Sequence, residues 1–206
     1  MKKKKVRTNK KIRAAALELL RDPNFLFLVG QQLSAAGVVG EAQNLLILYL
    51  ACLTGSLEHE VSVLVKGPSS TGKSNLMKAV LPLVPPEKVL TRSSFTGKAL
   101  AYASEELAGK ILYLVEHRGG KDGAFFRRLL QSEGAIHHEA TTGSGHSRGT
   151  KVTTRIGAPV FLSTTTDERV YDDDETRFLS IRADESAEQS RQVFRDQFSK
   201  KRRETI

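Results

Sequence analysis

The sequence predicts an α/β protein of three layers, in which helices cover both faces of a five-stranded, mainly parallel sheet. From Val61 onward, short β-rich runs alternate with stretches of helical periodicity, the pattern of strand-helix-strand units in a parallel sheet. Before Val61 the apolar residues recur only at helical spacing, which indicates a small helical bundle in front of the sheet. With 206 residues, the chain has the length of one such domain.

The positive charge of the chain is concentrated at its two ends. The formal net charge is +9, but residues 1–13 carry eight Lys or Arg and no acid, and residues 200–203 carry four more. We predict a basic, disordered arm over residues 1–11, which either contacts the phosphates of nucleic acid or is simply solvated. No apolar run approaches the roughly 20 residues of a membrane helix, so no membrane partner is expected. The single Cys52 excludes an internal disulfide, which suits a cytoplasmic protein.

Residues 12–58 are assigned to the N-terminal helical bundle, which capping residues divide into helices. Asp22 and Pro23 supply an N-cap and a proline at the first helical position, and Gly37 ends the helix that begins there. The three predicted helices cover residues 12–21, 23–36 and 41–53.

The core of the protein, residues 59–184, is predicted from five β-rich runs with helices between them. Before the fourth run, two extended arms flank a glycine-rich turn, which predicts a β-hairpin inserted over residues 136–156. Residues 185–206 are predicted to form a C-terminal helix and a basic tail. The strands are predicted at residues 61–66, 88–91, 111–115, 159–163 and 178–181. The helices after the bundle are predicted at residues 73–83, 96–107, 123–131 and 187–200.

The segment Gly67–Ser74 matches the phosphate-binding P-loop pattern. Such a loop needs a strand before it and a helix after it, because its backbone N–H groups face the phosphates at the helix N-terminus. Gly72 allows the tight turn, Lys73 can neutralise the β- and γ-phosphates, and the Ser74 hydroxyl can bind Mg²⁺. The motif therefore predicts a P-loop NTPase fold that binds ATP and Mg²⁺. The predicted nucleotide-binding residues are Gly67, Pro68, Ser69, Ser70, Thr71, Gly72, Lys73 and Ser74.

A second site residue is predicted at the end of the third strand. Five apolar residues precede Glu116, so its carboxylate should emerge at the carboxyl edge of the sheet, where parallel sheets place ligands. We expect Glu116 to act in catalysis and to hold Mg²⁺ together with Ser74. The next position, where many ATPases have a water-activating Glu, is His117. Either His117 or an acid such as Glu133 or Glu139 positions the water, or hydrolysis is slow.

Further catalytic candidates follow the hairpin. Thr164, or alternatively Thr165, could place a hydroxyl beside the γ-phosphate, although β-branched residues also close ordinary strands. Arg177 stands before the fifth strand, where it either reaches the nucleotide of a neighbouring subunit or pairs with adjacent acids. The acidic run Asp172–Glu175 lacks the spaced ligands of a calcium loop and is interpreted as a solvated face.

The order of these features resembles the AAA+ ATPases. A hairpin just before the sensor strand resembles the branch of the superfamily-three viral helicases and the minichromosome-maintenance helicases. In detail, four segments look like the ATPase module of primase-helicase-like proteins of phages and integrated mobile elements, over residues 12–185. These segments are Gly67–Ser74, Ser132–Gly134, Thr164–Thr166 and Glu175–Arg177.

This resemblance implies that Thr164 or Thr165 is the first sensor, that Arg177 is an arginine finger, and that the protein forms a homo-oligomer such as a hexameric ring. It also implies single-stranded DNA and other replication proteins as partners, with the hairpin tip as the DNA contact. The chain ends one helix after the fifth strand, without the usual four-helix lid. Either the N-terminal helices replace that lid, or the chain is one piece of a larger replication protein.

The predicted DNA-contacting tip covers residues 145–151. Its residues His146, Arg148 and Lys151 suit a sequence-independent contact with a phosphate backbone, and a mobile surface loop is the plainer interpretation. Two functions follow from the sequence as a whole. One is a DNA-dependent ATPase motor of the helicase type, and the other is an ATP-switched loader or recruitment module with weak hydrolysis, which His117 favours.

Overall fold

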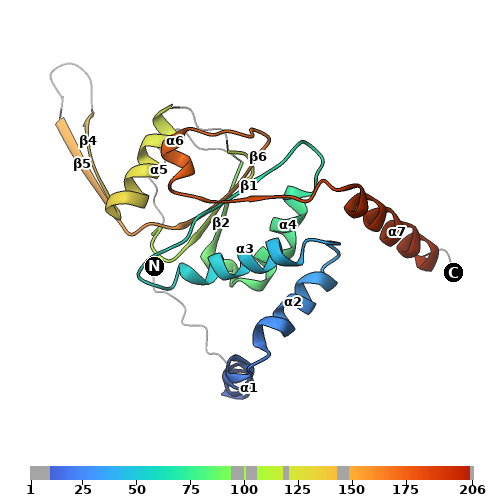
Figure 1. The fold of residues 1–206 in the computed structure, drawn as a ribbon. Coiled ribbons are helices and arrows are strands. Elements are labelled where there is room, and N and C mark those ends of the chain that lie inside the picture. Colours follow the sequence, from blue (N-terminus) through green and yellow to red (C-terminus); the bar gives the residue numbers. More distant parts are fainter. Residues whose placement is uncertain (1–9, 94–99, 101–105, 118–120, 143–148, 205–206) are drawn as a thin grey trace.

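A five-stranded parallel sheet forms the centre of the fold (Figure 1). The computed structural model describes residues 10–93, 100, 106–117, 121–142 and 149–204. The strands follow the order β2-β3-β6-β1-β7, and all neighbouring pairs are parallel. The predicted α/β fold with a five-stranded sheet is therefore confirmed. The strands are β1 Val63–Lys66, β2 Val89–Arg92, β3 Ile111–Leu114, β6 Val160–Thr165 and β7 Leu179–Arg182.

Alternating side chains of the strands contribute to two apolar cores, one on each face of the sheet. Val63 and Val65 of β1 belong to a core shared with α3 and α4, whereas Leu64 belongs to a second core shared with α5. This division follows from the two-residue period of a strand. Because helices cover both faces, the strands are almost continuous apolar runs, as is typical of parallel sheets. The covering helices are α3 (Ala42–Thr54), α4 (Lys73–Val80) and α5 (Lys121–Glu133).

The strand register brings the carboxyl ends of three central strands to one edge of the sheet. Lys66, the last residue of β1, pairs with Thr165 of β6, and Leu114, the last residue of β3, pairs with Ser163 of β6. The segments that follow β1 and β3 therefore leave the sheet on either side of the end of β6. Open parallel sheets bind ligands at this edge.

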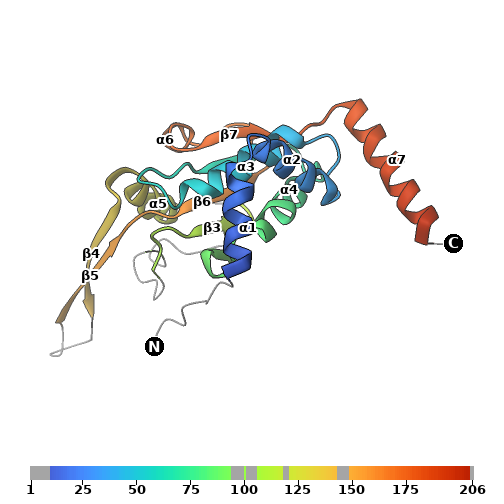
Figure 2. The same ribbon diagram turned by 90° about the horizontal axis from the view of Figure 1, so that it is seen from below.

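The three N-terminal helices are present, but they contribute unequally to the core. α1 (Lys10–Arg21) has no buried residue, and α2 (Phe25–Ala35) buries Leu33 alone. By contrast, α3 buries Leu45, Leu48, Ala51 and Cys52 against the sheet. α3 is therefore a layer of the core, while α2 leads away from it to α1 at the bottom of Figure 1; in Figure 2, seen from below, α1 lies in front of the body.

Two elements project from the body of the molecule. Among the described residues, the hairpin strands β4 (Ala135–Thr142) and β5 (Gly149–Ile156) pair only with each other, as an antiparallel sheet that extends away from the central one (Figure 1). At the opposite side, α7 (Ala187–Glu204) projects beyond β7. The remaining described elements are the short helix α6 (Asp172–Glu175) and two 3-10 turns, Leu81–Leu83 and Pro86–Lys88.

Two sequence predictions fall largely beyond the part of the chain that the structure describes. His146 and Arg148 of the predicted DNA-contacting tip lie outside the described residues, whereas Lys151 lies on β5 opposite Ala140. The predicted helix over residues 96–107 also lies mostly outside them. Within the described residues, none of the helices has the length and apolar character needed to cross a bilayer.

Candidate nucleotide-binding site

The loop between β1 and α4 has the backbone geometry that a phosphate-binding loop needs. Gly67 and Gly72 have φ of +151° and +85°, in the region that favours glycine. A Cβ at Gly67 would lie 3.1 Å from the Thr71 hydroxyl oxygen, so a side chain there would crowd the loop. Gly72 is the N-cap of α4, and the loop therefore leads its backbone N–H groups directly into a helix N-terminus, which attracts anions.

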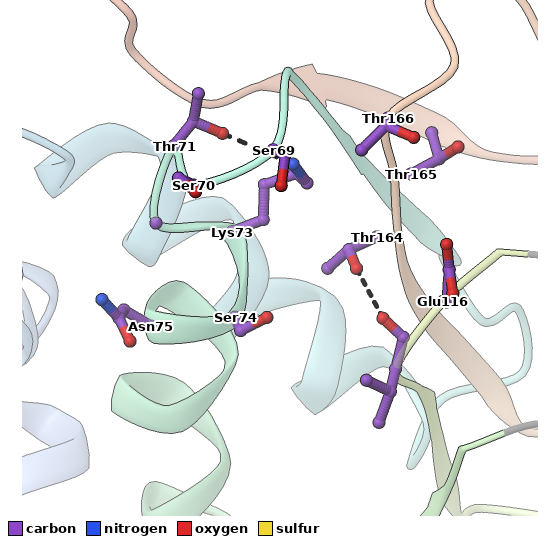
Figure 3. A pocket seen from close by; sticks show the side chains of 12 residues that line it. Ser69, Ser70, Thr71, Lys73, Ser74, Asn75, Glu116, Thr164, Thr165 and Thr166 are labelled. Atoms are coloured by element: carbon purple, nitrogen blue, oxygen red, sulfur yellow. Dashed lines mark hydrogen bonds between the residues drawn. The ribbon is translucent and has the colours of Figure 1, made fainter.

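Lys73, the first residue of α4, is buried with its ammonium group turned back over the loop (Figure 3). Its Nζ donates to the carbonyl oxygens of Gly67, at 2.7 Å, and Pro68, and it lies 3.5 Å from the Thr71 hydroxyl. Burial lowers the pKa of Lys73, and the charge of Glu185 partly offsets that effect. A phosphate would give this ammonium stronger, charge-assisted hydrogen bonds than the neutral oxygens do.

A cavity of about 420 Å³ joins the loop to the ends of β3 and β6. Figure 3 shows Lys73 and Thr71 on one wall and Glu116 and Thr164 on the other. The sequence had predicted most of these residues separately, and the parallel register brings them together at one sheet edge. The cavity is lined by Ser69, Ser70, Thr71, Gly72, Lys73, Ser74, Asn75, Val115, Glu116, Thr164, Thr165 and Thr166.

The residues of this cavity fit a nucleotide and Mg²⁺. Ser74 and Glu116 both line it, and Mg²⁺ is commonly held by one or two protein oxygens together with phosphates and water. Ser74 also hydrogen-bonds the Tyr113 side chain, which partly offsets the rise that burial causes in the pKa of Tyr113. Sequence reasoning missed Tyr113, because it is one of several apolar-looking residues in a buried strand.

The two candidate sensor threonines differ in the hydrogen bonds that they make. Thr164 Oγ1 donates to the Val115 carbonyl at 2.6 Å, so its proton is engaged and only its lone pairs can serve a ligand. Thr165 Oγ1 instead accepts from the backbone N–H of Asp167 at 3.1 Å, so its proton can point elsewhere. Both threonines are buried and both line the cavity.

His117 does not line the cavity. Its backbone N–H donates to the Thr164 carbonyl at 2.7 Å, but its ring is buried in the opposite direction. There, Nε2 lies 3.5 Å from a carboxylate oxygen of Asp174, and the ring meets Phe178 edge-on. Glu133 and Glu139, the other candidates for positioning the attacking water, are exposed and also do not line the cavity.

The interpretation of residues 172–175 as a solvated face is wrong for Asp174. This side chain is 2 % exposed and forms an ion pair of 2.7 Å with Arg127, which is also 2 % exposed. Burial alone raises the pKa of Asp174, but hydrogen bonds from His117 and Arg127 outweigh it and lower the pKa from 3.8 to about 2. No sequence pattern near Asp174 or Arg127 indicates that either side chain is buried, because the burial depends on the contact between α6 and α5.

Arg177 also lies away from the cavity of its own chain. Its Nε donates to the Ser132 hydroxyl at 3.1 Å, and its Nη1 donates to the backbone carbonyl of Asp173 at 2.6 Å. In this structure Arg177 therefore bonds two neutral oxygens, not the adjacent carboxylates that the sequence offers as partners. The guanidinium stands on the surface formed by α5 and α6.

A second cavity, of about 620 Å³, lies on the other side of the loop. It is bounded by the 37–41 segment after α2, by residues 69–72 and by the first half of α7. Gln189 of α7 donates to the Val39 carbonyl, and Glu41 accepts from the backbone N–H of Asp184 at 2.7 Å. No sequence pattern indicates this cavity, because its walls are about 150 residues apart along the chain.

Comparison with known proteins places these features in a family. A family model described as the MTBMA_p00010 P-loop domain matches residues 13–206. The matched range includes the residues that line both cavities, the hairpin, most of α1 and all of α2 to α7. No curated protein matches the chain.

Proposed function

The chain belongs to the MTBMA_p00010 P-loop domain family, and from this premise we propose that it is an ATPase whose hydrolysis drives an oligomeric DNA helicase or translocase. A P-loop domain indicates nucleotide binding. The choice of ATP, the oligomer and the DNA are our proposals, supported by the site and by the resemblance of its motifs to helicase-like AAA+ modules.

One observation carries the proposal: a single cavity contains the P-loop, the carboxylate of Glu116 and the hydroxyls of Thr164 and Thr165. The loop N–H groups and Lys73 would hold the phosphates, while Ser74 and Glu116 would hold Mg²⁺. The bound metal would supply charge neutralisation at the phosphates. Thr164 can orient a water only as an acceptor, because its proton is already donated to Val115.

The nucleoside of the bound ATP would occupy the second cavity, which has the P-loop as one of its walls. It shares residues 69–72 and Asn75 with the first cavity, so one molecule can reach both. Its wall includes the partly buried apolar residues Val39 and Val193 for a base to pack on. Carboxylates such as Asp184 and Glu185 also line it, and these suit ribose hydroxyls better than further phosphates.

The proposed oligomer rests on Arg177. Its guanidinium lies outside its own cavity and is held by a hydroxyl and a carbonyl, in a position from which a neighbouring subunit's nucleotide could receive it. The proposed DNA contact rests on the hairpin, which projects from the body and pairs with no other sheet among the described residues.

The environment of His117 favours a second candidate, an ATP-switched loader or recruitment module. Among the described residues that line the first cavity, Glu116 is the only carboxylate, and the buried His117 ring faces away from it. A site with one carboxylate can bind Mg²⁺-nucleotide while activating water poorly. Such a module binds nucleotide tightly and hydrolyses it slowly, whether or not DNA is present.

Steady-state hydrolysis with and without single-stranded DNA separates the two candidates. The motor predicts turnover that single-stranded DNA stimulates, that Lys73→Ala abolishes, and that loses its DNA stimulation when the hairpin is shortened by replacing residues 141–150 with an Asn-Gly turn. The shortened hairpin should leave nucleotide affinity unchanged, since no described residue of the hairpin lines either cavity. Tight ATP binding with slow, DNA-independent turnover would reject the motor and support the switch.

A further inference from the structure

The short acidic helix α6 makes ion pairs that reach both walls of the proposed nucleotide site. Glu175 accepts a hydrogen bond from Lys66, the residue immediately before the P-loop. Asp174, one residue earlier, pairs with Arg127 of α5 and contacts His117, the residue immediately after Glu116. Two adjacent carboxylates therefore hold the two segments that carry the candidate Mg²⁺ ligands.

The connection from Asp174 to the cavity is short. His117 is fixed at its ring by Asp174 and Phe178, and at its backbone by the Thr164 carbonyl, 2.7 Å away. The Thr164 hydroxyl in turn holds the Val115 carbonyl at 2.6 Å. Glu116 thus stands between two residues that are held by hydrogen bonds and, at His117, by a buried ring.

The connection from Glu175 reaches the other wall. Lys66 is buried at the end of β1, and its Nζ also donates to the Glu168 carbonyl at 3.3 Å. A second acceptor on Glu175, the oxygen bonded by the Ser180 hydroxyl at 3.0 Å, fixes the carboxylate from the side of β7. The start of the P-loop is consequently held by α6, the same short helix that contacts His117 after Glu116.

Stability alone is a poor explanation for this arrangement. A buried ion pair gives little net stability, because removing both charges from water costs about as much as their attraction returns. In the described part of the chain, His117 Nδ1 and Arg127 Nε have no hydrogen-bond partner although both are buried. Buried polar atoms without partners are uncommon in native proteins and call for a functional reason.

We propose that α6 is a positioning element for the nucleotide site, in which Asp174 and Glu175 set the placement of Glu116 relative to Ser74 and so the geometry of the Mg²⁺ ligands. This inference rests on the proposed function, since it assumes that Ser74 and Glu116 hold the metal. Neither Asp174 nor Glu175 lines the cavity, so both act through His117 and Lys66.

The test measures how tightly a fluorescent ATP analogue binds the full chain as Mg²⁺ is varied, for Asp174→Asn and Glu175→Gln. Groups that orient metal ligands typically contribute about 10- to 100-fold in metal affinity. We therefore expect each variant to need about tenfold more Mg²⁺ for half-maximal tightening, with less than about threefold change in affinity without Mg²⁺. The matched control is Asp173→Asn on the same helix, whose carboxylate is exposed and pairs with Arg128 at 2.7 Å.

A readout without metal or nucleotide accompanies the titration. Amide hydrogen exchange at residues 115–117 should be faster in Asp174→Asn than in the wild type, and unchanged in Asp173→Asn. If Asp174→Asn does not fold, Glu175→Gln decides, because the Glu175 side chain is 35 % exposed and glutamine keeps an oxygen that can accept from Lys66. Folded variants with the wild-type Mg²⁺ dependence, even if less heat-stable, would overturn the positioning role alone. A wild type that binds no nucleotide at any Mg²⁺ concentration would overturn the proposed function with it.

Discussion

Among the described residues, Asp174 is a carboxyl whose ionisation makes the stability of the fold depend on pH. Its pKa is about 2 in the folded chain, against 3.8 ordinarily, because His117 and Arg127 favour the carboxylate more than burial disfavours it. A carboxyl with a lowered pKa stabilises the fold above its unfolded pKa and loses that contribution as the pH falls towards the folded pKa. Over the window from about pH 4 to about pH 2, the loss amounts to about 2 kcal/mol.

Replacement of this carboxylate should therefore change the acid side of the stability profile. Asp174→Asn leaves the buried Arg127 charge without its partner and is expected to lower the free energy of unfolding by about 3 kcal/mol at pH 7. Between pH 4 and pH 2, the variant should lose about 2 kcal/mol less than the wild type does. Urea unfolding at several pH values measures both effects. An acid profile parallel to that of the wild type would show that Asp174 is not the titrating group.

At the residue scale, the sequence predicted the groups that follow a strand or a recognisable loop. The P-loop pattern identifies Lys73 and Ser74, and a preceding apolar strand identifies Glu116 and Thr164. The parallel sheet brings all four into one cavity. The cluster of Asp174, Arg127 and His117 could not be predicted, since its partners are up to 57 residues apart and charged residues are ordinarily exposed. The position of His117 after Glu116 suggests water activation, a role that the burial of its ring beside Asp174 does not support.

At the element scale, the three N-terminal helices contribute to the core in different degrees, from none in α1 to four buried residues in α3. Periodicity predicted all three helices, but it could not show that α3 packs on the sheet while every residue of α1 is exposed. The contacts that decide this are between segments distant in sequence. The exposed apolar residues of α1, including Ile12 and Leu20, contribute no core contact in this structure.

α1 and α3 should consequently differ in their effects on stability. Deleting residues 1–21 is expected to change the melting temperature by less than about 2 °C, because α1 buries nothing. Leu48→Ala in α3 should lower the free energy of unfolding by about 3 kcal/mol, since it opens a cavity in the main core. Thermal and chemical unfolding of the two variants measure this contrast. A deletion as harmful as Leu48→Ala would mean that α1 packs on the body in solution.

At the scale of the whole molecule, the strand order and the position of the chain ends determine which surfaces are available. The order β2-β3-β6-β1-β7 places the nucleotide cavity at one sheet edge, with the hairpin and α7 projecting in opposite directions. Local periodicity predicted the number of strands and the inserted hairpin. It could not predict the second cavity, because that requires α7 to return beside the segment after α2.

The proposed shared site makes the oligomeric state depend on nucleotide. A non-hydrolysable ATP analogue should convert the wild type into a larger homo-oligomer, and Arg177→Ala should weaken this conversion because the guanidinium no longer reaches the neighbouring nucleotide. Light scattering after size exclusion gives the masses. Arg191→Ala, on the exposed part of α7, is the control. A strict monomer under all conditions would remove the shared-site mechanism.

The most direct test of the central claim is calorimetric titration of the full chain with a non-hydrolysable ATP analogue and Mg²⁺. We expect one site per chain and affinity at least about 100-fold weaker in Lys73→Ala, because the Lys73 ammonium would otherwise bond the phosphates. Lys78→Ala, which removes an exposed lysine from the same helix, should bind as the wild type does. Wild-type protein that binds no nucleotide, or Lys73→Ala that binds as tightly as the wild type, would contradict the assignment of the cavity.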